Sequence, residues 1–102
     1  MAPLIEQHRD RIVELCKKYG ITRLDVFGSA ARGDDFDPGK SDVDFFYDID
    51  ETQPDLAGRF LDFIIEVEEL LCRRVDMVSI PDMKKPLFLE VANRRRIELY
   101  AA

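Results

Sequence analysis

Residues 27–50 read FGSAARGDDFDPGKSDVDFFYDID. Before this stretch, Leu24 and Val26 begin an apolar strand pattern, which breaks at Gly28. Toward its end apolar and polar residues alternate, as in a strand with one buried face, and the apolar ones are Val43, Phe45, Tyr47 and Ile49. The turn signal Asp37-Pro38-Gly39 lies between the two patterns, and the connection is too short for a parallel crossover. We therefore predict two neighbouring antiparallel strands.

Asp42 and Asp44 are two residues apart at the start of the second strand. Such residues point to the same face of a strand, with Cα atoms about 6.5–7 Å apart, so their carboxylates can converge on metal ions. Oxygen ligands of this kind suit Mg²⁺, and the ions of a two-metal site lie about 3.5–4 Å apart. The alternative interpretation is an exposed strand face that simply carries acids.

Asp76 is predicted to join this pair. It lies in an apolar run, residues 74–80, where an unpaired carboxylate would be costly to bury. The second strand, the helical pattern after it and this run together have the length of a crossover unit, so the run should form a third strand parallel to the second. Asp76 would then share a face with the first two acids. The alternative is a salt bridge from Asp76 to Arg73 or Arg74.

Gly28 and Ser29 are typical of a turn that binds phosphate. Glycine lets the backbone approach a ligand, and the free amides that open a helical turn over residues 29–32 attract phosphate oxygens. The Ser29 hydroxyl adds a donor, and Arg32 could reach the same phosphates or pair with a nearby Asp. The simpler interpretation is a turn that ends a strand. Taken with the acids, the pattern predicts part of a site that holds a nucleoside triphosphate through divalent metal.

Two longer helices are expected outside this stretch. Pro3 suits the first turn of a helix over residues 3–19, and Gly20 is a natural end for it. Asp55 is placed to cap a second helix. The apolar stripe of that helix consists of Phe60, Phe63, Ile64, Val67, Leu70 and Leu71.

The C-terminal residues predict a short helix over 86–93 and a last strand or extended tail over 97–100. There are no repeats, linkers or low-complexity segments. We expect a single domain over residues 1–102, of the α+β class, in which a short mixed β-sheet packs against helices.

Composition bears on the partners of the protein, its compartment and the state of its thiols. The net charge is -6, and residues 34–55 carry nine acids against one base, Lys40, which disfavours direct nucleic-acid binding. No apolar run approaches the ~20 residues that cross a bilayer, which favours the cytoplasm. Cys16 and Cys72 fall in helical patterns without metal-ligand spacing, so buried free thiols are expected. The single histidine, His8, lies beside an apolar stripe and receives no role.

Three motifs occur in the order of a known signature: residues 28–33 (GSAARG), residues 41–44 (SDVD) and Asp76 on a later strand. This combination resembles that of the minimal nucleotidyltransferases, a family within the DNA polymerase β-like nucleotidyltransferase superfamily. The resemblance implies the minimal form of that fold. It also implies a displacement at the α-phosphorus of ATP, with pyrophosphate leaving.

Residue roles follow from the same resemblance. It assigns catalysis and the binding of two Mg²⁺ ions to Asp42, Asp44 and Asp76. It assigns nucleotide binding to Gly28, Ser29, Arg32 and Ser41.

The sequence also resembles the minimal nucleotidyltransferase antitoxins that are paired with helical HEPN-domain ribonuclease toxins. That likeness implies transfer of AMP from ATP to a tyrosine hydroxyl of the toxin, in a hetero-oligomer that neutralises it. We expect so short a chain to depend on its partner for both the hydroxyl and the rest of the cleft.

Two alternatives remain open at the level of sequence. The protein could neutralise a toxin by occlusion alone, with contacts from the basic run Arg94-Arg95-Arg96 and the exposed parts of the two longer helices; that run could equally be a solvated tail. It could instead transfer the nucleotide to a hydroxyl of a small molecule, as the aminoglycoside nucleotidyltransferases do.

Overall fold

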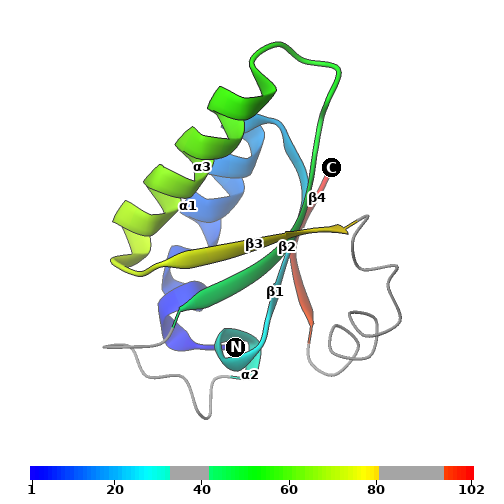
Figure 1. Cartoon of the computed structure of the whole chain (residues 1–102). Coiled ribbons are helices and arrows are strands. Elements are labelled where there is room, and N and C mark those ends of the chain that lie inside the picture. Colours follow the sequence, from blue (N-terminus) through cyan, green and yellow to red (C-terminus); the bar gives the residue numbers. More distant parts are fainter. Residues whose placement is uncertain (33–41, 81–95) are drawn as a thin grey trace.

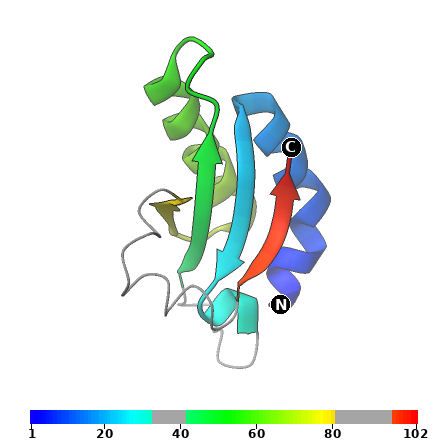
Figure 2. The same cartoon turned by 90° about the vertical axis from the view of Figure 1, so that its right-hand side faces the viewer.

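The computed structural model describes residues 1–32, 42–80 and 96–102 (Figures 1 and 2). In chain order the elements of these ranges are α1 (Pro3–Tyr19), β1 (Ile21–Phe27), α2 (Ser29–Arg32), β2 (Val43–Ile49), α3 (Leu56–Leu71), β3 (Val75–Ser79) and β4 (Ile97–Ala101). The strands form one sheet in the order β3-β2-β1-β4. The predicted α+β class is confirmed.

The mixed character of the sheet follows from the connections. The strand β1 runs antiparallel to both β2 and β4, whereas β2 and β3, which α3 connects, are parallel. Both expected pairings are thus confirmed. The last segment is a strand, not a tail, because β4 adds to the free edge of β1.

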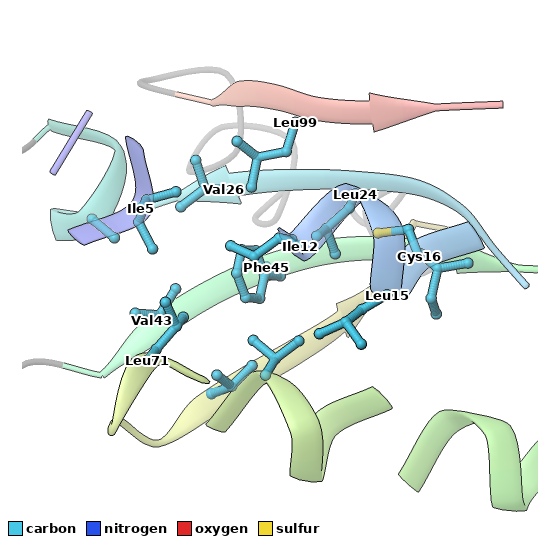
Figure 3. Packing of buried hydrophobic residues seen from close by; sticks show 14 of the residues in the cluster. Ile5, Ile12, Leu15, Cys16, Leu24, Val26, Val43, Phe45, Leu71 and Leu99 are labelled. Atoms are coloured by element: carbon cyan, nitrogen blue, oxygen red, sulfur yellow. The ribbon is translucent and has the colours of Figure 1, made fainter. Parts of the chain in front are cut away.

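Helices α1 and α3 pack side by side on one face of the sheet. Figure 2 shows α3 behind β2 and α1 behind β4, with the other face of the sheet toward the viewer. Figure 3 shows the core between these layers. Its side chains of at most 1% exposure include Ile12, Leu15, Leu24, Val26, Val43, Phe45, Phe63 and Val67. Burying a side chain of this kind contributes about 1.5–3 kcal/mol of transfer free energy, so this face supplies most of the stability.

The ends of α1 fix the position of α2. Gly20 takes a left-handed conformation (φ 75°) and its amide donates to the carbonyl of Cys16, which ends α1 as predicted. At the other end the amide of Ala2 donates to the carbonyl of Ala30 at 2.7 Å. This bond ties the start of α1 to α2, so α2 is held at the end of β1 (Figure 2).

Two predictions about single residues were wrong. Asp55 precedes α3 but its side chain makes no capping hydrogen bond, because its left-handed backbone (φ 59°) turns the carboxylate against Gly58. Cys72 is a free thiol but an exposed one, since α3 ends at Leu71 and Cys72 itself is left-handed (φ 53°). Cys16 is buried and free, as expected, and burial raises the pKa of its thiol to about 12.

The predicted loop over residues 34–40, Ser41 and the predicted helix over 86–93 lie outside the described residues. The ring of His8 donates from Nδ1 to the carbonyl of Leu4 at 2.8 Å, a local helical contact. No helix in the described part of the chain is long and apolar enough to cross a membrane.

Candidate active site

An acid pair lies on the sheet face that α1 and α3 leave uncovered. Asp44 in β2 is directly opposite Asp76 in β3. Paired residues share a face, and their neighbours Val43 and Phe45 point into the helix-covered core, so both acids point away from it. Asp42 precedes β2 and is exposed. The prediction that Asp76 shares a face with Asp44 is therefore confirmed.

The electrostatics of Asp44 show that these acids are close. Its pKa is raised from 3.8 to about 6, first by burial, then by the charge of Asp76 and a hydrogen bond between the two carboxyl groups, and last by the charge of Asp42. A carboxylate whose neighbours are also carboxylates is held in an unfavourable field, which a cation would relieve. A cation on this face of the sheet would therefore favour the ionised form of Asp44.

Asp76 itself departs from one expectation. It is exposed rather than buried, and no ion pair among the described residues joins it to Arg73 or Arg74. The reason is that β3 is at the edge of the described sheet and its outward face is open there. Because Asp76 is exposed, the argument from the cost of burying a charge does not apply to it. Its position opposite Asp44 is the remaining reason to assign it to the site.

The three acids are candidate ligands of a divalent cation. Within residues 1–32, 42–80 and 96–102, no three Asp, Glu, His or Cys side chains are gathered tightly enough to enclose a metal ion. The donor set nevertheless fits Mg²⁺, because it consists of carboxylate oxygens alone, and the pKa of Asp44 is raised by burial and then by the neighbouring carboxylates. The arrangement is an open one, in which a substrate would provide part of the coordination.

Gly28 brings the backbone turn against the acid pair. Its φ is 71°, a left-handed value that glycine adopts without strain, and a Cβ placed on it would lie 2.8 Å from Oδ2 of Asp44. The amide of Ala31 donates to the Gly28 carbonyl at 3.2 Å, which closes the turn into α2. Ser29 and Arg32 lie in α2, the first and last residues of that short helix. The turn at Gly28 and the Asp44–Asp76 pair are thus adjacent.

Sequence reasoning missed a buried acid beside this site. Asp25 in β1 is fully buried, and its carboxylate accepts a hydrogen bond from Nε of Arg96 and pairs with Nη2 of Arg23 at 3.3 Å. Arg96 is therefore a structural partner that holds β4 to β1, not part of a solvated basic tail; Arg94 and Arg95 lie outside the described residues. The available signal was an acid between Leu24 and Val26 in an apolar run, the same pattern that marked Asp76.

An aromatic stack connects the buried pair to the acid pair. The guanidinium of Arg96 lies over the ring of Phe46 at 5.5 Å, and Phe46 stacks on Phe27 with ring centroids 4.0 Å apart and planes 18° apart. Phe27 is in turn directly opposite Asp44. Val78 and Ile80 also pack against Phe46. This small second cluster supports the uncovered face from within the sheet.

Comparison with known proteins assigns the class. The sheet, the turn and the acids define a nucleotidyltransferase, and residues 7–99 match the nucleotidyltransferase domain family. A solved structure described as "Structure of putative minimal nucleotidyltransferase" is 30% identical, covers 95% of each chain and superimposes with a TM-score of 0.73. The chain therefore belongs to the nucleotidyltransferase domain family, and within it to the minimal nucleotidyltransferases.

Two further proteins are similar. One is from Methanocaldococcus jannaschii and named "Putative protein adenylyltransferase"; it is 29% identical over 69 residues, 68% of this chain and 67% of that protein. The other is a structure of a tri-AMPylated Shewanella oneidensis HEPN toxin in complex with an MNT antitoxin, matched at 13% identity with a TM-score of 0.62 over 95% of this chain and 72% of that one. At this identity the second likeness shows the fold alone.

Proposed function

We propose that this nucleotidyltransferase is an antitoxin that transfers AMP from ATP to a tyrosine hydroxyl of a cognate HEPN-type ribonuclease toxin and so neutralises it. One observation carries the catalytic part of the proposal: Asp44 lies opposite Asp76 and against the turn at Gly28, with its pKa raised to about 6. Acids that merely decorated a strand would have no reason to be held together against a glycine turn.

The roles of the residues follow from that arrangement. Asp44 and Asp76, with Asp42, would hold Mg²⁺, which when bound neutralises the triphosphate and activates the α-phosphorus for attack. Gly28 would let backbone amides approach the triphosphate, and Ser29, Arg32 and Ser41 are proposed to bind the same group. The chain itself would contribute positioning and electrostatic complementarity to the displacement, in which the acceptor oxygen bonds to the α-phosphorus and pyrophosphate leaves.

The likeness to other proteins supports the partner and the transferred group. A relative is named for protein adenylylation, and a neighbour in fold is an MNT antitoxin in a complex whose HEPN toxin carries AMP. These proteins make a hydroxyl of a partner protein a better candidate acceptor than that of a small molecule. ATP and magnesium enter the proposal on the same grounds.

The test is an AMP-transfer assay. Purified protein, radiolabelled ATP, Mg²⁺ and a candidate HEPN-type partner protein are incubated, and label on the partner is measured. We expect label with the natural chain and at least about 100-fold less with Asp44→Asn. The matched control is Asp10→Asn, which changes an exposed acid of α1 and should leave transfer unchanged.

Two outcomes would contradict the proposal. Absence of label across Mg²⁺, Mn²⁺ and all four nucleoside triphosphates would exclude transfer to this partner. Equal losses in Asp44→Asn and Asp10→Asn would show that the acid pair has no special part in the reaction.

A further inference from the structure

A hollow lies on the side of the sheet opposite the acid pair. It has a volume of about 290 Å³ and is formed by the last residues of β2, the end of β3 and the first turns of α3. Its floor is aromatic, with the rings of Tyr47 and Phe60 5.0 Å apart. The remaining lining is Asp48, Ile49, Glu51, Leu56, Ala57 and Ser79. Because Tyr47 and Ser79 are paired three residues beyond the Asp44–Asp76 pair, the hollow is about 10 Å along the strands from the acids.

An apolar flank of α3 continues this hollow. The large apolar side chains that are most exposed in the described residues are Leu56 (39%), Leu61 (57%) and Ile65 (52%), all on α3. Leu61 and Ile65 are four residues apart and therefore neighbours on the helix surface. Ala57, which lines the hollow, is four residues before Leu61, so Ala57, Leu61 and Ile65 form one line of side chains about 12 Å long on the helix surface. Together the hollow and this flank, here called the α3 surface, offer a groove with a ridge beside it.

Among the described residues, the charges that border the α3 surface are negative. Glu51 lines the hollow, and the exposed Asp62 is three residues before Ile65 and therefore its neighbour on the helix surface. The sequence of α3 contains one base, Arg59, whose guanidinium donates to the carbonyls of Tyr19, Pro54 and Asp50 on the side toward α1. The next bases along the chain, Arg73 and Arg74, begin about 12 Å beyond Ile65.

This border argues against a second copy of the chain as the occupant. In a two-fold interface the same surface meets itself, so the acids of both copies would be brought together. Like charges placed opposite one another across an interface cost several kcal/mol. A surface with an apolar centre and an acidic border instead complements an apolar segment with a basic border.

We infer that the α3 surface docks an amphipathic helix of a partner protein, with apolar side chains in the hollow and against Leu61 and Ile65, and Lys or Arg beside Glu51 and Asp62. Resting on the proposed function, the helix belongs to the acceptor protein. A partner held on the helix side of the sheet leaves the acid face uncovered for ATP and for the segment that carries the hydroxyl. Recognition and chemistry would then use opposite faces of one small sheet.

The test uses synthetic helical peptides and the full chain without ATP, so it does not depend on AMP transfer. Two fluorescein-labelled peptides share one leucine stripe, bordered by lysines in one and by glutamates in the other, and binding is measured by fluorescence anisotropy. We expect the lysine peptide to bind at least about tenfold more tightly than the glutamate peptide. The double variant Leu61→Asp/Ile65→Asp should lower the affinity for the lysine peptide at least about tenfold.

The charge of the border is tested by Asp62→Lys, with Asp10→Lys as its matched control. Asp10 is an exposed acid on α1, so both variants change the net charge equally. We expect Asp62→Lys to weaken binding about threefold or more and Asp10→Lys to leave it unchanged. Circular dichroism checks that each variant is folded.

Three results would overturn the inference. Equal losses in Asp62→Lys and Asp10→Lys would reduce the binding to general attraction by an acidic protein. Unchanged binding in Leu61→Asp/Ile65→Asp would exclude the α3 surface. A dimer of the natural chain in light scattering that this double variant abolishes would assign the surface to a second copy. If binding behaves as expected while the AMP-transfer assay is negative, the docking surface stands and the proposed function fails.

Discussion

The two faces of the β-sheet have opposite designs. On the face covered by α1 and α3, every inward side chain of β1 and β2 is apolar, and Phe45 has no exposed surface. On the uncovered face the same strands carry Asp25 and Asp44, one of them neutralised by arginine and the other held beside another carboxylate. The first face stabilises the fold, whereas the second keeps unfavourable charge in place. Because the two roles are on separate faces, the stable core can offset the unfavourable charge at the site.

The largest expected effect is a loss of stability from a substitution on the covered face. Phe45→Ala should lower the free energy of unfolding by about 3–5 kcal/mol, because it removes a fully buried ring from the core between sheet and helices. Phe46→Ala is the matched change on the other face, where an equally buried ring packs against Phe27, Val78 and Ile80. We expect Phe46→Ala to lower the free energy of unfolding less than Phe45→Ala does, and to lower AMP transfer more. Urea unfolding and the transfer assay measure the two quantities. Equal effects of the two variants on both quantities would contradict the division of roles.

A smaller change tests the contact between turn and acid. Gly28→Ala places a Cβ 2.8 Å from Oδ2 of Asp44 in a residue with φ 71°. The strain should cost about 1–2 kcal/mol of stability, and the displaced carboxylate should lower AMP transfer about tenfold or more. Gly58→Ala is not a suitable control, because Asp55 lies against Gly58; Ala57→Gly on the same helix gives the size of a plain glycine effect. Full transfer in Gly28→Ala would remove this turn from the site.

The smallest expected effect is a pH-dependent change in stability at Asp44. The folded pKa of Asp44 is about 6 and its ordinary value is 3.8. Since the folded pKa is the higher one, the stability that protonated Asp44 contributes is complete below pH 3.8 and is lost as the pH rises through 6. Asp44→Asn keeps a neutral group there, so it should stabilise the metal-free protein at pH 8 by about 1–2 kcal/mol after solvent screening is allowed for.

The same variant should differ little from the natural chain in stability at pH 4, where both are mostly neutral at this position. Thermal unfolding in EDTA at the two pH values measures this. Adding Mg²⁺ at pH 8 should raise the melting temperature of the natural chain and of Asp10→Asn, but not of Asp44→Asn. Destabilisation by Asp44→Asn at pH 8 would show that the folded protein does not disfavour the ionised form of Asp44.

Much of this contrast was accessible from the sequence. The alternation in residues 43–49 placed Phe45 and Asp44 on opposite faces, and the length of the β2–α3–β3 unit predicted parallel strands with Asp76 on the face of Asp44. Both depend on short-range periodicity and chain length, which determine which way a side chain points.

Other features depend on contacts that periodicity does not encode. The pair between Asp25 and Arg96 joins residues 71 positions apart and requires β4 to add beside β1. The left-handed conformations of Asp55 and Cys72 depend on how the chain enters and leaves α3, so the expected cap and the expected burial were both wrong. The exposure of Asp76 depends on β3 being an edge strand of the described sheet.

The most direct test of the proposed function separates catalysis from occlusion inside cells. The double variant Asp42→Asn/Asp44→Asn is expressed at native level together with the HEPN-type toxin, and growth and co-purification of the two proteins are measured. Our account predicts that the variant still binds the toxin, since both substitutions lie away from the α3 surface, yet fails to restore growth. A double variant that protects cells as fully as the natural chain would contradict it, because occlusion alone would then be sufficient.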